Sequence, residues 1–258
     1  MLDLWRTLYR HRELIGILVA KQLKLRYRGS VLGFLWTLLN PLLLMLVYTL
    51  VFSVYLRVDV EHYPAFLLAG LLPWIWFASS LQQGVTSILD GAGLVIRSRF
   101  PVEVLPVVTL TTNSVNFILT LPILFAFLMA LQVKVGAALW ALVPLIVIEY
   151  LLALGPVLIL SALNVHYRDL QHIILHLLTL LQFLTPVLYP LSLVPETARP
   201  WALLNPLTIL ISAFHDVLYF NRTPPWPPLL GLFALSCVVL SVASVMFTRY
   251  KRTFAEAL

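Results

Sequence analysis

The fold is decided by a run of 26 residues without a charged side chain, VLGFLWTLLNPLLLMLVYTLVFSVYL, at positions 31–56. About 20 consecutive apolar residues suffice to cross the hydrocarbon core of a bilayer, so this run is long enough for a spanning helix. The whole chain has the same character, because 61% of its 258 residues are hydrophobic and 11% are charged. A soluble globule carries roughly a quarter charged residues, and a disordered chain is less apolar still. The sequence therefore predicts an all-α polytopic membrane protein.

Five further apolar ranges follow the first, at positions 64–89, 106–132, 137–163, 171–189 and 229–248. Each is close to the length that a spanning helix needs, and Glu149 is the charge that interrupts the fourth. Between the last two ranges lies the run 200–215, which is short and contains two prolines, so we interpret it as re-entrant or interfacial. The chain is thus predicted to form one transmembrane domain, residues 1–258, with six spans.

Basic residues predict the orientation of these spans. Six spans place both termini on the same side, where 13 Lys and Arg residues lie, against 4 on the opposite side. Because cytoplasmic loops carry the excess of Lys and Arg, both termini are predicted to be cytoplasmic. The net charge of +6 is explained by this rule rather than by binding to nucleic acid.

Residues 1–29 alternate Leu and Ile with basic side chains and include Trp5 and Tyr9, which is typical of an amphipathic helix lying on the cytoplasmic leaflet. Three basic residues near its end, Lys24, Arg26 and Arg28, can engage anionic membrane lipid or a diphosphate group. The alternative is that they only fix the topology.

Two spans carry side chains that favour a cavity. The first span has an aromatic stripe at helical spacing, Tyr48, Phe52 and Tyr55, and the fifth has a polar stripe, His172, His176, Thr179, Gln182 and Tyr189. Rings stack on the C–H faces of sugars, and amides and imidazoles bond their hydroxyls, so we predict that both stripes line a channel. The polar stripes of the second and third spans are interpreted mainly as helix packing; they comprise Ser79, Gln83 and Thr86, then Thr109, Thr112, Asn116 and Thr120.

Other chemistry has little support in the sequence. No glycine is followed by lysine, so the chain lacks the P-loop of an ATPase, and the common hydrolase and metalloprotease motifs are also absent. His172 and His176 have the spacing of metal ligands but no third strong ligand in their helix, so we expect no metal and no cofactor on this chain. Glu149 is interpreted either as functional or as protonated and bonded within the bundle.

The connection between the second and third spans, residues 91–105, reads GAGLVIRSRFPVEVL. An aromatic residue among charges is a plausible anchor in the groove of a soluble partner, and the candidate residues are Arg97, Arg99, Phe100, Pro101 and Glu103. The alternative is a basic loop that only fixes topology.

Taken in order, these segments resemble the polysaccharide-exporting ABC-2 permeases (Wzm-like), the membrane subunits of O-antigen, teichoic-acid and capsule ABC transporters. The resemblance is carried by KQLKLRYRGSVLGFLW at 21–36 with Asn40-Pro41, FLLAGLLPW at 66–74, FPVE at 100–103, NVHYRD at 164–169 and LNP at 204–206. Departures are His166 and His215, where arginine is more usual, and Gln22, where an acidic residue is common.

The resemblance implies the ABC-2 (type V) exporter fold in a bacterial inner membrane. It implies a homodimer bound to two copies of a separate ATP-binding subunit, which would hold the ATP and Mg²⁺. Residues 91–105 would couple to that subunit, residues 190–228 would form extracytoplasmic gate helices, and spans one and five would face a channel at the dimer axis.

The implied substrate is a polyprenyl-diphosphate-linked polysaccharide, with Lys24, Arg26 and Arg28 at its entrance. Two alternatives stay open. One is an ABC-2 exporter of drugs or small lipids. The other is a polytopic glycan-modifying enzyme, for which the external acids Asp59 and Glu61, beside His62, are the candidate pair.

Overall fold

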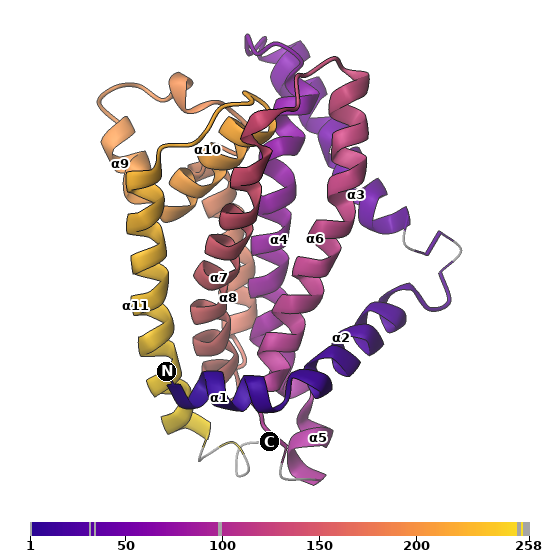
Figure 1. Cartoon of the computed structure of the whole chain (residues 1–258), viewed down its shortest axis with the longest axis vertical. Coiled ribbons are helices and arrows are strands. Elements are labelled where there is room, and N and C mark those ends of the chain that lie inside the picture. The colour runs from indigo at the N-terminus through magenta and orange to yellow at the C-terminus, as the bar shows by residue number, and fades with distance from the viewer. Residues whose placement is uncertain (1, 31, 34, 98–99, 252–253, 255–258) are drawn as a thin grey trace.

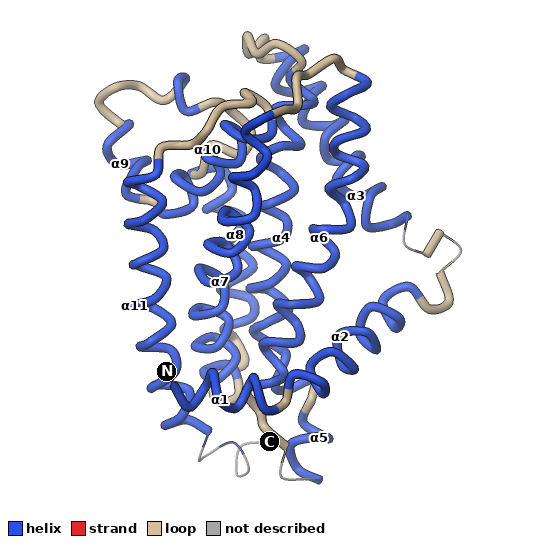
Figure 2. The backbone as a smooth tube through the Cα atoms, in the orientation of Figure 1, coloured by secondary structure: helices blue, strands red, loops and turns tan. Residues whose placement is uncertain are grey.

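The computed structural model describes residues 2–30, 32–33, 35–97, 100–251 and 254, and within these ranges it contains helices and loops but no strand (Figure 2). The helical elements are α1 (Leu2–Arg10), α2 (Arg12–Tyr27), α3 (Leu35–Thr49), the π-helix η1 (Leu50–Tyr55), α4 (Tyr63–Asp90), α5 (Ala92–Arg97), α6 (Val104–Ala130), η2 (Ala137–Ala141), α7 (Leu142–Asn164), α8 (Leu170–Leu184), η3 (Leu191–Leu193), α9 (Arg199–Leu204), α10 (Pro206–Leu218) and α11 (Trp226–Tyr250).

Five of the described helical stretches are long and apolar enough to cross a membrane: Leu35–Tyr55, Tyr63–Asp90, Val104–Ala130, Ala137–Asn164 and Trp226–Tyr250. They lie close to five of the six predicted ranges because those ranges follow from the length of uncharged sequence. The sixth, for residues 171–189, differs and is described below.

Helix α4 is the centre of the bundle and packs against α3, α6, α7, α8 and α10. Close approach between helices occurs at glycines: a Cβ atom on Gly84 of α4 would lie 2.8 Å from Val157 of α7, and one on Gly155 of α7 would lie 2.8 Å from Val239 of α11. Apolar surface does not drive helices together in lipid, so such small residues, which permit tight van der Waals contact, hold the bundle together.

The two ends of the bundle differ. Helix α1 crosses one end, where α5 and the C-terminal end of α11 also lie, whereas α9 and α10 lie toward the opposite end (Figure 1). Residues 2–27 form two helices, because the chain turns at His11 between α1 and α2. Helix α1 runs across the bundle, as expected of a helix in a membrane interface, whereas α2 runs obliquely away from it (Figure 1).

Helix α8 is shorter than the predicted span. Its 15 residues reach about 23 Å, against a hydrocarbon core of roughly 30 Å. Pro186 explains the early end, because a residue before proline avoids the helical region, and Thr185 is accordingly extended (φ −100°, ψ 139°). The helix that we predicted to continue to Tyr189 was therefore too long, and the count of six spans stays a prediction.

The irregular segment 185–188 is buried, and two of its polar groups are bonded to neighbouring elements. Asn205 Nδ2 donates to Thr185 Oγ1 at 2.9 Å, and the Tyr63 hydroxyl donates to the Leu188 carbonyl at 2.6 Å. Irregular backbone at membrane depth is tolerated where protein encloses it, as here.

The run 200–215, interpreted as re-entrant or interfacial, forms α9 and most of α10. Asn205 separates the two helices and caps α10, accepting the Leu207 N–H at 3.0 Å, and Pro206 follows in the first turn. Helix α10 is largely buried against α4, α7 and α11. These short helices occupy the region predicted to form a gate, and that role stays a prediction.

Candidate functional site

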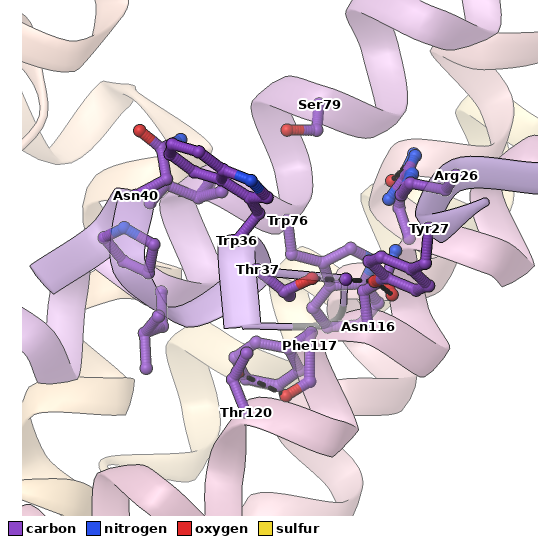
Figure 3. Close-up of a pocket in the computed structure, with 15 residues that line it drawn as sticks. Arg26, Tyr27, Trp36, Thr37, Asn40, Trp76, Ser79, Asn116, Phe117 and Thr120 are labelled. Carbon is purple, nitrogen blue, oxygen red and sulfur yellow. Dashed lines mark hydrogen bonds between the residues drawn. The ribbon is translucent and has the colours of Figure 1, made fainter. Parts of the chain in front are cut away.

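A cavity of about 320 Å³ lies where the C-terminal end of α2 meets the N-terminal half of α3 and the middle of α4 and α6 (Figure 3). Four elements that are distant in sequence each supply polar or aromatic side chains to its wall. The principal ones are Arg26 and Tyr27 of α2, Trp36, Thr37 and Asn40 of α3, Trp76 and Ser79 of α4, and Asn113, Asn116, Phe117 and Thr120 of α6.

Arg26 is an exposed side chain on this cavity, held in place by two amides. Its Nη2 donates to Gln83 Oε1 at 2.6 Å and to Asn113 Oδ1 at 3.1 Å. Asn113 Nδ2 also donates to Gln83 Oε1 at 3.3 Å, which closes the network. Because both partners are uncharged, they orient the guanidinium without cancelling its charge, and the site keeps its attraction for an anion.

Tyr27 ties three helices together beside Arg26. Its hydroxyl donates to Asn116 Oδ1 of α6 at 2.8 Å and lies 2.7 Å from Thr37 Oγ1 of α3 (Figure 3). A hydroxyl can donate one hydrogen bond and accept others, so Thr37 is the donor of the second bond. This contact fixes the interfacial helix α2 against the spanning helices.

Two buried N–H donors at the cavity have no hydrogen-bond partner in the described part of the chain: Trp76 Nε1 and Asn116 Nδ2. The Trp76 ring is held by stacking on Phe117, with centroids 4.8 Å apart and planes at 16°. Buried donors are normally paired, so each unpaired donor favours a ligand that supplies an acceptor. Phosphate and sugar oxygens are such acceptors.

The structure separates the three basic residues predicted at the entrance. Lys24 and Arg28 are four residues apart and lie together in a second, open hollow with Lys21 and Leu25. Arg26 is two residues from each and therefore projects to another side of the helix, into the cavity. Only Arg26 of the three lines the cavity with the tryptophans and amides.

The predicted aromatic stripe of the first span is divided between two environments. Tyr48 and Phe52 are half-buried and touch edge to face, and Phe52 stacks on Tyr63 of α4 with centroids 6.3 Å apart. Tyr55 is 69% exposed. Hydrogen bonds in a π-helix join residues five apart, and η1 covers Phe52 and Tyr55, so ideal α-helical spacing no longer applies.

The predicted polar stripe of the fifth span is only partly on one helical face. His172, His176 and Thr179 are exposed on α8, opposite its buried residues Ile174 and Leu178. Gln182 is half-buried and its Nε2 lies 3.5 Å from the Tyr48 hydroxyl, which brings the two stripes together at one point.

Tyr189 lies beyond the end of α8, not on its helical face, and its hydroxyl donates to the Phe183 carbonyl at 2.8 Å. The channel-lining role of both stripes stays a prediction.

The predicted coupling residues are more enclosed than an exposed anchor would be. Phe100 is half-buried and packs beside Val19 of α2 and Val104 of α6, and Glu103 forms an ion pair with Lys251 at 2.7 Å. Pro101 is half-buried, and Arg97 ends α5. Arg99 lies outside the described residues.

Two further candidates have the following surroundings. Glu149 is fully buried in α7, and neither of its carboxyl oxygens has a hydrogen-bond partner among the described residues, so the predicted bonding within the bundle is not seen. His62 Nε2 lies 3.7 Å from Glu61 Oε1, and the two side chains are 44% and 87% exposed.

Sequence reasoning missed most of the cavity. Gln83, Asn116, Ser79 and Thr120 belong to stripes that we interpreted mainly as packing, and Trp36, Trp76 and Asn113 were not singled out at all. A usable signal exists, because three amides in two adjacent apolar spans are costly in lipid and need a polar partner. Those partners, Arg26 for Gln83 and Asn113 and Tyr27 for Asn116, are supplied by a helix outside the spans.

Comparisons with known proteins cover nearly the whole chain. The model of a family described as "ABC-2 type transporter" matches residues 13–219. The chain is 45% identical to the O-antigen export system permease protein RfbA of Myxococcus xanthus, over 100% of both chains. It is 32% identical to the protein of the same name from Klebsiella pneumoniae, over 95% of each, and 25% identical to the polysialic acid transport protein KpsM of Escherichia coli, over 78% of this chain and 80% of that protein.

Proposed function

Because this chain belongs to the ABC-2 type transporter family, we propose that it is the membrane subunit of an ATP-driven exporter of polyprenyl-diphosphate-linked polysaccharide. It is a multi-pass membrane protein and a permease rather than an enzyme. O-antigen export is the activity named for relatives at 45% and 32% identity, and we assign the same class of cargo here. We place the protein in a bacterial inner membrane with both termini in the cytoplasm.

The observation that carries the assignment is the cavity beside Arg26. A lipid-linked glycan presents a diphosphate at the membrane surface, followed by its first sugars. Arg26 offers an uncompensated positive charge to the diphosphate, and the ring of Trp36, which is 50% exposed, offers a stacking surface to a sugar. Trp76 Nε1 and Asn116 Nδ2 would then find acceptors.

The pathway across the membrane is proposed to lie between two copies of the chain. Polar His172, His176 and Thr179 are exposed on the face of α8 turned away from its own bundle. Polar side chains facing acyl chains are costly, so this face is better suited to a water-filled channel than to lipid. Tyr48, Phe52, Tyr55, Gln182 and Tyr189 would complete the lining and let a long glycan slide past stacked rings.

Energy is proposed to come from two copies of a separate ATP-binding subunit, which would hold ATP and Mg²⁺. This subunit would dock on the end of the bundle where α5 lies (Figure 1). Movement there would rock the two permease chains apart and open the pathway.

The test uses the purified complex of permease and ATPase in proteoliposomes, with lipid-linked glycan and ATP. Arg26→Gln is expected to weaken the apparent affinity for the glycan about ten-fold, since hydrogen bonds to charged groups contribute about 1.5–3 kcal/mol. Lys24→Gln and Arg28→Gln are the matched controls, because they remove the same charge from the same helix outside the cavity.

Three equal effects would indicate attraction to the anionic leaflet rather than a site, and an unaffected Arg26→Gln variant would contradict the cavity assignment. Deletion of the gene is expected to remove the surface glycan. Normal glycan together with raised drug sensitivity would favour the exporter of drugs or small lipids instead.

A further inference from the structure

The segment expected to face the ATPase is joined to the other end of the sequence by an ion pair. Glu103 directly precedes α6, and Lys251 directly follows α11, 148 residues later. Lys251 Nζ donates to Glu103 Oε1 at 2.7 Å. The pair therefore joins the segment between α4 and α6 to the last spanning helix.

The carboxylate of this pair is largely buried. The Glu103 side chain is 13% exposed, Oε2 is buried without a described partner, and the flanking Val102 and Val104 are 4% and 0% exposed. Taking a partner away from a buried charge is far more costly than breaking a pair in water. Lys251 engages Oε1 of Glu103 and Oε2 is buried, so direct contact of Glu103 with the ATPase stays a prediction.

The end of α11 is also anchored by aromatic packing. Phe254 is 1% exposed and meets Phe247 edge to face, with centroids 5.7 Å apart. The His166 ring, in the connection between α7 and α8, lies 5.8 Å from the Tyr250 ring and 6.4 Å from the Phe254 ring. The connection between α7 and α8 and the connection between α4 and α6 thus both contact the end of α11.

Helix α11 links this contact to the rest of the bundle. It packs along α7, where Gly155 lets the backbone of Leu240 approach, so the two helices are closely seated. Phe100, near the end of the same connection, packs against Val19 of α2. A displacement of residues 100–104 would therefore press on α2 at one side and on α11 at the other.

We propose that the Glu103–Lys251 ion pair transmits movement of the ATPase-facing connection to α11, which makes Glu103 a positioning residue for the last span. The inference rests on the proposed function. The surface that we assign to the ATPase is α5, on which Gly93 is exposed. Export then depends on the pair, whereas binding of the ATPase does not.

The first experiment compares Glu103→Gln, Lys251→Gln and the exchanged double variant Glu103→Lys with Lys251→Glu in the complex with the ATPase. Each single variant is expected to co-purify with the ATPase normally and to export about ten-fold less glycan per ATP hydrolysed, a typical allosteric coupling. The exchanged pair is expected to regain most of the export. Arg249→Gln is the control, because it removes an exposed charge from the same end of α11 and is expected to change nothing.

A second experiment needs no glycan and so separates this inference from the proposed function. Amide hydrogen exchange is measured with the ATPase free and trapped by ATP and vanadate. In the wild type the end of α11 and the start of α6 are expected to respond together. In Glu103→Gln the response of α11 is expected to disappear while that of α6 remains, and the exchanged pair is expected to restore it.

Equal responses of α11 in the wild type and Glu103→Gln would overturn the proposal, whatever the cargo is. Loss of ATPase binding in Glu103→Gln, with unchanged export per ATP in the remaining complex, would also overturn it and would make Glu103 a docking residue. Full export by both single variants would do the same.

Discussion

Two spanning stretches of this protein have opposite relations between apolarity and burial. The most apolar 18 residues of α3 with η1 have a mean hydropathy of 2.0, and 6% of them are buried. In α4 the mean hydropathy is 1.5, and 78% of the corresponding residues are buried. The less apolar helix is thus the more buried one. In lipid, apolar surface gives no reason for helices to associate, so the small and polar residues of α4 place it at the centre.

The sharpest way to break this comparison is to remove the close contact on α4. Gly84→Leu is expected to destabilise the protein by about 3 kcal/mol or more, because even a Cβ would lie 2.8 Å from Val157. The measurement is the thermal unfolding of the detergent-purified protein. Gly231→Leu in α11 is the matched control, since nothing lies within 4 Å of its Cβ position. Equal stability of the two variants would show that tight packing does not hold α4.

The second largest effect concerns the contact between α4 and α10. The His215 ring stacks on Phe66 with centroids 4.0 Å apart and lies against Gly70, and burial lowers its pKa from 6.5 to about 3. The unfolded chain therefore binds a proton below pH 6.5 that the folded chain does not, and stability falls as the pH falls toward 3. Between pH 7 and pH 5 the expected loss is about 2 kcal/mol.

Unfolding measured across this pH range checks the expectation. His215→Phe keeps a stacked ring and is expected to remove this part of the pH dependence. A variant with an unchanged pH profile would show that other groups are responsible.

Helix α8, like α3, has many exposed side chains, and its exposed polar face can be tested for contact with water. In a Cys237→Ala background, cysteine at His176 is expected to react with a membrane-impermeant maleimide about ten-fold faster than cysteine at Leu177, because polar exposed faces turn toward water. Both side chains are exposed, and only the first lies on the polar face. Similar rates in the assembled transporter would contradict the channel assignment of α8.

The smallest effect is expected where Tyr27 of α2 joins α3 to α6. Tyr27→Phe removes the hydroxyl between Thr37 and Asn116, and is expected to destabilise the protein by about 1 kcal/mol while leaving the ring in place. Thermal unfolding measures this change. Tyr9→Phe on α1, where the ring is 72% exposed, provides a control in which no change is expected.

Most of the helices were predictable because each follows from local sequence. Uncharged length gave the spans, and Pro186 could also have given the end of α8, since the restriction on Thr185 acts between neighbours. The π-turns of η1 have no comparable local signal, so the division of Tyr48, Phe52 and Tyr55 between two environments was not predictable.

The candidate site was predictable only in part, because its contacts join distant residues. Arg26 was identified by its charge, but its amide partners Gln83 and Asn113 lie 57 and 87 positions further along. Glu103 was predicted as an ATPase contact from the local run at 97–103, and its ion-pair partner Lys251, 148 positions away, could not be predicted from that run. Residue types indicated which polar groups need a hydrogen-bond or ion-pair partner. The packing of the bundle determined which residue became that partner.

The shortness of α8 has a consequence for the membrane around the protein. Were α8 to cross the membrane as the sixth predicted span, its length of about 23 Å would fall about 7 Å short of a core of roughly 30 Å, a hydrophobic mismatch that surrounding lipids relieve by thinning. A single protomer would thin the bilayer next to this helix, whereas pairing two protomers there would shield it from lipid. In the proposed dimer, thick bilayers would therefore promote pairing and thin ones would weaken it, so that lipid chain length would control assembly.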